Sequence, residues 1–83
     1  MLNQELTRTV LREIDTLLKK EVVPVTNDYL EHLSQDINIL EYLLELKAAG
    51  LISGNLITMS LTGSPHRMTN IRLTYAGIRA LRQ

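Results

Sequence analysis

The sequence predicts a small single domain, residues 1–83, of the α+β class, and three observations lead to this expectation. Apolar residues recur at helical spacing in residues 5–20 and again through residues 26–49. After Gly50 the pattern changes to β-branched and apolar residues interrupted by Gly and Pro, which is typical of a hairpin. A chain of 83 residues suffices for one core, because a domain of this size buries roughly 60 to 65 per cent of the surface that its unfolded chain exposes.

The first element is an amphipathic helix over residues 5–20. Its apolar residues follow one another at steps of three and four positions, an acidic residue lies near its start, and two lysines lie at its end, which suits the helix dipole. Residues 21–25 are β-branched and include Pro24, so they predict an edge strand or an extended linker. The residues expected on the buried face of the helix are Leu6, Val10, Leu11, Ile14, Leu17 and Leu18.

Two more helices are expected before Gly50. Thr26 or Asn27 can cap a short second helix of about two turns. The third helix spans residues 36–49, and Gly50 stands where a left-handed glycine would end it. The expected core residues are Tyr29, Leu30 and Leu33 on the second helix, and Ile37, Leu40, Leu43, Leu44 and Leu46 on the third. On the third helix Asn38, Glu41 and Glu45 form an outward stripe with Tyr42 beside it.

The segment after Gly50 predicts a hairpin followed by a short last helix. Leu51 and Ile52 close the core, residues 53–55 turn, residues 56–60 and 68–73 form two strands, and residues 61–66 form the hairpin tip. In the second strand, Thr69, Ile71 and Leu73 are expected to share one face. Thr74 can cap the last helix, in which Tyr75, Ile78 and Leu81 are expected to point inward.

The formal net charge is zero, but the two signs are separated along the chain. Residues 61–83 contain four arginines, Arg67, Arg72, Arg79 and Arg82, and no acidic residue. Residues 21–50 contain six acidic residues, and Lys47 is the single lysine or arginine among them. The six are Glu21, Asp28, Glu31, Asp36, Glu41 and Glu45. One part of the molecule should therefore be negative and another positive.

Several classes of protein are disfavoured by composition and motifs. The chain has no cysteine, which excludes disulfides, thiolate metal sites and cysteine nucleophiles. Its N-terminal segment has charged residues throughout, so neither a signal peptide nor a membrane span is expected, and we expect a soluble, cytoplasmic protein. The two histidines, His32 and His66, lack metal-ligand spacing, and no catalytic or nucleotide-binding motif is present. We therefore expect no enzyme activity, cofactor or metal.

Two blocks of sequence resemble the winged helix-turn-helix superfamily. The stretch LEYLLELKAAGLISG, residues 40–54, is similar to the third helix and its exit, and IRLTYAGIRAL, residues 71–81, is similar to the return strand and last helix. In the second block the matching positions are Leu73, Thr74, Gly77 and Leu81. The resemblance implies a three-helix core with a two-stranded β wing and a short C-terminal helix. Within the superfamily, the chain is most similar to small bacterial and phage proteins.

The resemblance implies two alternative functions. Many members bind DNA, with the third helix in the major groove and the wing against the backbone or minor groove, so the leading expectation is a DNA-binding transcriptional regulator in a phage or mobile-element setting. Others are protein-interaction modules that do not bind DNA. Homodimerisation through the first helix, or through the first and last helices together, is a further hypothesis, because the short chain is rich in apolar residues.

Each alternative uses its own set of residues. Gln35 and Asn38 have side chains that can pair with adenine, although both can equally be ordinary solvated residues, and Tyr42 is either an exposed reader or a core tyrosine. The wing residues either contact DNA or form a solvated turn. The DNA-binding candidates are Gln35, Asn38, Tyr42, His66, Arg67 and Arg72, and the protein-interaction candidates are Asp36, Glu41 and Glu45.

Overall fold

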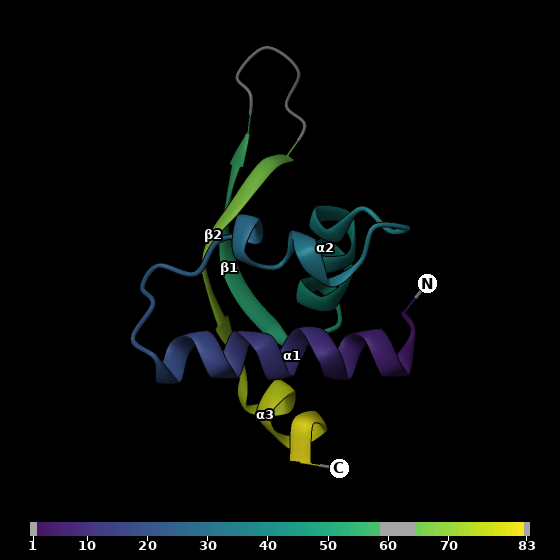
Figure 1. The fold of residues 1–83 in the computed structure, drawn as a ribbon, viewed down its shortest axis with the longest axis vertical. Coiled ribbons are helices and arrows are strands. Elements are labelled where there is room, and N and C mark those ends of the chain that lie inside the picture. The colour runs from purple at the N-terminus through teal and green to yellow at the C-terminus, as the bar shows by residue number, and fades with distance from the viewer. Residues whose placement is uncertain (1, 59–64, 83) are drawn as a thin grey trace.

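The protein is an α+β fold in which helices precede a two-stranded antiparallel hairpin and a last helix follows it (Figure 1). The computed structural model describes residues 2–58 and 65–82. The expected fold class is therefore confirmed at this level. The elements are α1 (Gln4–Lys19), the 3₁₀ turns η1 (Asn27–Tyr29) and η2 (Glu31–Leu33), α2 (Ile39–Ala48), β1 (Ile52–Thr58), β2 (Pro65–Leu73) and α3 (Tyr75–Arg82).

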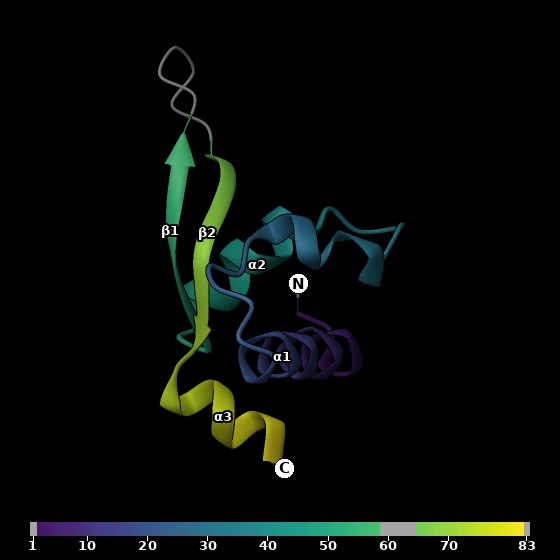
Figure 2. The same cartoon turned by 60° about the vertical axis from the view of Figure 1, so that its left-hand side comes forward.

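The helices pack on one side of the hairpin, and α3 lies below α1 at the base of the hairpin (Figure 2). Their apolar faces meet the inner face of the hairpin in one core. Among the described residues, none of the helices combines the length and the apolar character needed to span a lipid bilayer. The buried apolar residues are Val10, Leu11, Ile14, Val25, Leu30, Ile39, Tyr42, Leu43, Leu46, Ile52, Met68 and Ile71.

Helix α1 agrees with its sequence pattern. Asn3 caps it, because its Oδ1 accepts a hydrogen bond from the Leu6 amide at 3.0 Å. Its predicted apolar residues are either buried or pack partly buried against the core. Residues 21–25, which follow the helix, form an irregular linker with a turn at Glu21, and not a strand. One backbone hydrogen bond, from the Ile71 amide to the Val25 carbonyl at 2.9 Å, ties this linker to the edge of β2.

The expected second helix is replaced by two 3₁₀ turns, and this changes which residues are buried. A 3₁₀ turn repeats every three residues, so positions 27, 30 and 33 share one face. Asn27 and Leu30 are buried on that face, and Leu33 is partly buried. Tyr29 falls outside it and is 46% exposed, so its assignment to the core is wrong.

Helix α2 begins later than expected, at Ile39. The Asn38 Oδ1 accepts a hydrogen bond from the Glu41 amide at 3.3 Å, so Asn38 is the N-cap. Ile37 therefore precedes the helix and is 40% exposed, which makes its assignment to the core wrong. The predicted end of the helix is confirmed, since Gly50 has a φ of 81°.

The turn expected at residues 53–55 is wrong, because strand β1 runs through these residues. In the hairpin Ser53 pairs with Arg72 and Asn55 pairs with Thr69, so Gly54 faces two residues of β2, Asn70 and Ile71. This is a β-bulge, and Asn70 at the bulge has a φ of 55°. A Cβ on Gly54 would lie 3.0 Å from the Met68 side chain, so glycine leaves room for this buried side chain.

The bulge also changes the inward face of β2. Without it, Thr69, Ile71 and Leu73 would share a face, as the sequence pattern predicted. The extra residue reverses the alternation, so Met68 and Ile71 are both fully buried, while Thr69 is on the opposite face. Of the predicted hairpin tip, residues 61–64 lie outside the described residues, and residues 65 and 66 belong to β2.

The Thr74 cap of α3 is confirmed and also joins α3 to the end of α2. The Thr74 Oγ1 accepts a hydrogen bond from the Gly77 amide at 3.0 Å and donates one to the Gly50 carbonyl at 2.6 Å. The Thr74 amide donates to the Leu51 carbonyl at 3.1 Å. The segment that leaves α2 and the segment that enters α3 are therefore held side by side.

Helix α3 is rotated relative to the expectation from its apolar spacing. Gly77 is buried, and a Cβ at this position would lie 2.0 Å from the Leu51 carbonyl oxygen. Since this backbone contact turns Gly77 inward, Tyr75 and Ile78 turn outward, and both are exposed. Their predicted inward orientation is wrong, whereas Leu81 is partly buried and packs against the core.

Candidate interaction surface on α2

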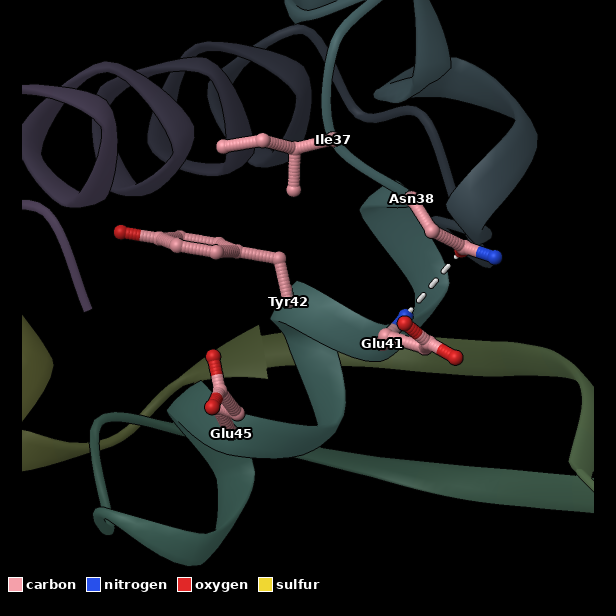
Figure 3. Close-up of a pocket in the computed structure, with 5 residues that line it drawn as sticks. All are labelled: Ile37, Asn38, Glu41, Tyr42 and Glu45. Atoms are coloured by element: carbon pink, nitrogen blue, oxygen red, sulfur yellow. Dashed lines mark hydrogen bonds between the residues drawn. The ribbon is translucent and has the colours of Figure 1, made fainter. Parts of the chain in front are cut away.

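The exposed side of α2 has an acidic character. Glu41 and Glu45 lie one turn apart on it and both side chains are exposed, as is Asp36 just before the helix. Together with Ile37, Asn38 and the edge of Tyr42, the two glutamates line a shallow groove (Figure 3). In Figure 3 Ile37 and the Tyr42 ring project to the same side, with the Glu45 carboxylate close to the ring. We name the surface formed by these residues the α2 face.

Tyr42 is a core residue. It is 2% exposed, and its hydroxyl donates to the Asn3 carbonyl at 2.8 Å while accepting from the Asn3 amide at 3.0 Å. The Thr7 hydroxyl lies 2.5 Å from the same oxygen. Because the phenol is occupied by the start of α1, the alternative in which Tyr42 is an exposed reader of bases is wrong.

We expect Tyr42→Phe to lower the free energy of unfolding by about 1–2 kcal/mol, because the Asn3 backbone and the Thr7 hydroxyl lose their shared partner. Urea unfolding followed by circular dichroism measures the loss. Faster amide exchange at Thr7 should accompany it. Tyr29→Phe is the matched control, since Tyr29 is exposed and its change should be nearly neutral. Equal effects of the two changes would contradict this role of Tyr42.

The two amide side chains proposed to read bases are both exposed. Gln35 precedes α2, and Asn38 stands at its N-cap. The Asn38 carbonyl oxygen is engaged in the cap, while its amide nitrogen points away from the helix (Figure 3). Asn38 could therefore donate to a ligand but could not use its oxygen without losing the cap. A bidentate contact to adenine would need both atoms.

Arg67 and Arg72 occupy the positions of β2 next to the buried Met68 and Ile71. Arg67 pairs with Ile57 and Arg72 pairs with Ser53 across the strands, positions that alternate with the buried ones. Arg67 forms an ion pair, since its Nη2 lies 2.5 Å from the Asp28 Oδ2 in η1. Both side chains of this ion pair are largely exposed, so the pair contributes little to stability. The His66 side chain lies outside the described residues.

The acidic residues of the α2 face do not form a metal site. In the described residues, 2–58 and 65–82, no group of three or more His, Cys, Asp or Glu side chains could hold a metal ion. The acidic residues of the α2 face are spread along the outside of a helix and not gathered in a cavity. Such an arrangement is suited to binding a surface of opposite charge.

Sequence reasoning missed two features of the site. The first is the exposure of Ile37, which a sequence signal could have revealed: an Asn followed three residues later by Glu marks a helix start at Asn38, which places Ile37 before the helix. The second is Asp28 as the partner of Arg67. The two residues are 39 positions apart, and no local pattern pairs them.

No family model matches the chain, and no curated protein or solved structure is significantly similar to it.

Proposed function

We propose that the chain is a winged helix-turn-helix domain that acts as a protein-interaction module through its α2 face. The order of elements supports the fold assignment: a helix, an irregular linker, two short turns, a helix, a hairpin and a last helix. The linker hydrogen-bonded to β2 and the contact of the Thr74-to-Gly77 block with the end of α2 agree with it too. In this fold, α2 corresponds to the helix that enters DNA in the DNA-binding members.

The observation that favours protein binding is the charge of the exposed side of α2. Glu41 and Glu45 are exposed there, Asp36 lies just before them, and Lys47 is the one basic residue of the helix. Carboxylates near phosphates oppose DNA binding, which depends on Lys and Arg side chains that displace counterions. A basic protein surface meets the same carboxylates with favourable electrostatics.

The second candidate is a DNA-binding transcriptional regulator, possible in a phage or mobile-element setting. The specific observation in its favour is that Arg67 and Arg72 are both exposed on β2, at positions that alternate with its buried ones. The exposed amides of Gln35 and Asn38 at the start of α2 agree with it as well. In this mode the hairpin would supply the phosphate contacts. A phosphate would compete with Asp28 for the Arg67 guanidinium, because the two side chains form an exposed ion pair.

Capture of a partner tests the first candidate. The immobilised chain should retain a basic protein from an extract of its source cells, and retention should fall at least about tenfold for Glu41→Lys with Glu45→Lys. The matched control is Glu5→Lys with Glu21→Lys, which makes the same change in net charge at exposed positions away from α2. Equal retention by both double variants would overturn the proposal, because binding would then not depend on the α2 face.

Fluorescence anisotropy with duplex DNA tests the second candidate. We expect no binding at micromolar protein and about 50 mM salt, where a phosphate-dependent binder would bind most strongly. The regulator hypothesis predicts the opposite, with two signatures. Arg72→Ala should reduce the slope of log affinity against log salt by about one unit, and Asp28→Asn should raise the affinity, because it frees Arg67. Observation of both signatures would replace the first candidate with the second.

A further inference from the structure

The outer side of α3 is an exposed stripe that is apolar and basic. Ile78 and Arg79 lie three and four residues after Tyr75, and Arg82 lies four and three residues after them, so the four residues lie on one side of the helix. Tyr75 is 76% exposed, and the Arg79 guanidinium carbon lies 5.8 Å from the centre of its ring. Residues 61–83 contain no acidic residue, and the groove that Ile78 and Arg82 help to line also holds Asp15 and Lys19 of α1. We name these four residues the α3 stripe.

The groove of the α2 face has the complementary chemistry. Its apolar part consists of Ile37, which is 40% exposed, and the edge of the Tyr42 ring. Glu41 and Glu45 line the same groove with carboxylates. A long side chain with an apolar stem and a cationic end fits this combination, since the stem can cover the apolar part while the end meets a carboxylate. Arginine on a short amphipathic helix presents such a side chain.

We propose that the α2 face of one copy binds the α3 stripe of a second copy, an inference that rests on the proposed function of the α2 face. Charge complementarity is the argument for this occupant. Each copy has zero net charge, with acidic residues on the α2 face and basic residues on the α3 stripe. A symmetric contact between two α3 stripes would bring four arginine side chains together, and a symmetric contact between two α2 faces would oppose glutamates. Of these three pairings, the unlike one is electrostatically favourable.

Helix α1 is a poorer candidate for contact between copies. Its apolar residues Val10, Leu11 and Ile14 are fully used in the core of the same copy. The groove on its outer side is lined by polar and charged residues: Gln4, Glu5, Arg8, Thr9 and Arg12. The apolar content of the chain therefore gives no reason for dimerisation through α1, whereas Tyr75 and Ile78 on α3 remain exposed.

The contact joins two different surfaces, which determines how association proceeds. Each pair leaves one α2 face and one α3 stripe unoccupied, so the assembly grows or closes into a ring. A contact made by one helix of 8 residues is small, so micromolar or weaker affinity is expected. Since charge pairs contribute to it at the surface, salt should weaken it.

A charge exchange between the two surfaces tests the inference. Variant one is Glu41→Lys with Glu45→Lys, and variant two is Arg79→Glu with Arg82→Glu. Sedimentation at low salt should give an average mass above 9.4 kDa for the wild-type chain and close to 9.4 kDa for each variant alone. An equal mixture of the two variants should regain the higher mass, because each basic surface again meets an acidic one.

Two further variants keep the test decisive. Arg12→Glu with Lys20→Glu changes the net charge as much as variant two does, at exposed positions on or next to α1, and should associate like the wild type. Tyr75→Ser removes the most exposed apolar group of the stripe without reversing charge, and should weaken association at least about fivefold even if variant two fails to fold.

The inference is overturned if the wild-type chain sediments at 9.4 kDa up to about millimolar concentration and low salt, or if the mixture of folded variants does not gain mass. Its failure is distinguishable from failure of the proposed function. Partner capture that depends on Glu41 and Glu45, in a chain that stays monomeric, would preserve the function and remove only the second copy as the occupant.

Discussion

Replacing Gly77 by alanine is expected to lower the free energy of unfolding by about 2–3 kcal/mol. The new Cβ would lie 2.0 Å from the Leu51 carbonyl oxygen, a backbone atom that cannot rotate away. Relief of the clash would require α3 to move outward. That movement would stretch the hydrogen bonds from Thr74 to the carbonyls of Gly50 and Leu51.

The predicted loss of stability in Gly77→Ala is opposite in sign to the usual effect of this substitution in a helix. In an ordinary helix position, glycine to alanine stabilises by up to about 1 kcal/mol. Ala76→Gly, at an exposed position of the same helix, is the matched control and should cost about 0.5–1 kcal/mol from propensity alone. Urea unfolding monitored by circular dichroism gives both values. A Gly77→Ala chain that is as stable as the wild type would contradict the close approach of α3 to Leu51.

The contact at Gly77 also bears on the two proposed surfaces. The α3 stripe begins at Tyr75, directly after Thr74. Thr74 donates hydrogen bonds to the carbonyls of Gly50 and Leu51, which lie just beyond the end of α2. The α2 face and the α3 stripe are therefore fixed relative to each other by a few short contacts. A loss of association in the Gly77→Ala chain, at conditions where it remains folded, would follow from displacement of the stripe.

The elements that could be predicted from the sequence are those governed by local chemistry. Helix α1 follows from apolar residues at helical spacing, Gly50 ends α2 because the chain there needs a positive φ, and Thr74 caps α3 with its own hydroxyl. The exposure of Glu41 and Glu45 follows from the same periodicity. In each case the deciding interaction lies within about one turn of the residue.

The elements that could not be predicted depend on contacts between distant residues. Tyr42 is buried because its hydroxyl meets Asn3 and Thr7, which are 39 and 35 positions away. The bulge at Gly54 reverses the alternation of β2, and the pairing that produces it is a property of both strands together. Apolar spacing in α3 pointed Tyr75 and Ile78 inward, but backbone contact at Gly77 overrides that spacing.

Asn27→Ala is expected to lower the free energy of unfolding by about 2–3 kcal/mol, because it removes a buried polar connection between η1 and β2. Asn27 is 4% exposed, and its Oδ1 accepts a hydrogen bond from the Met68 amide at 3.0 Å. Its Nδ2 donates to the Glu31 Oε2 at 2.8 Å. Alanine would leave the Met68 amide buried without a partner, and this desolvation cost exceeds the value of the hydrogen bond itself.

Two other variants distinguish the contribution of the hydrogen bond to Met68 from that of the hydrogen bond to Glu31. Asn27→Asp keeps an acceptor for the Met68 amide but places a carboxylate against Glu31, so it should also destabilise. Adding Glu31→Gln should recover part of this loss, because the new amide can donate to the carboxylate at position 27. Asn55→Ala is the control, since Asn55 is exposed on β1 and its loss should change stability by less than about 0.5 kcal/mol. If Asn27→Ala costs no more than Asn55→Ala in urea unfolding, the edge of β2 does not depend on this side chain for its hydrogen bonding.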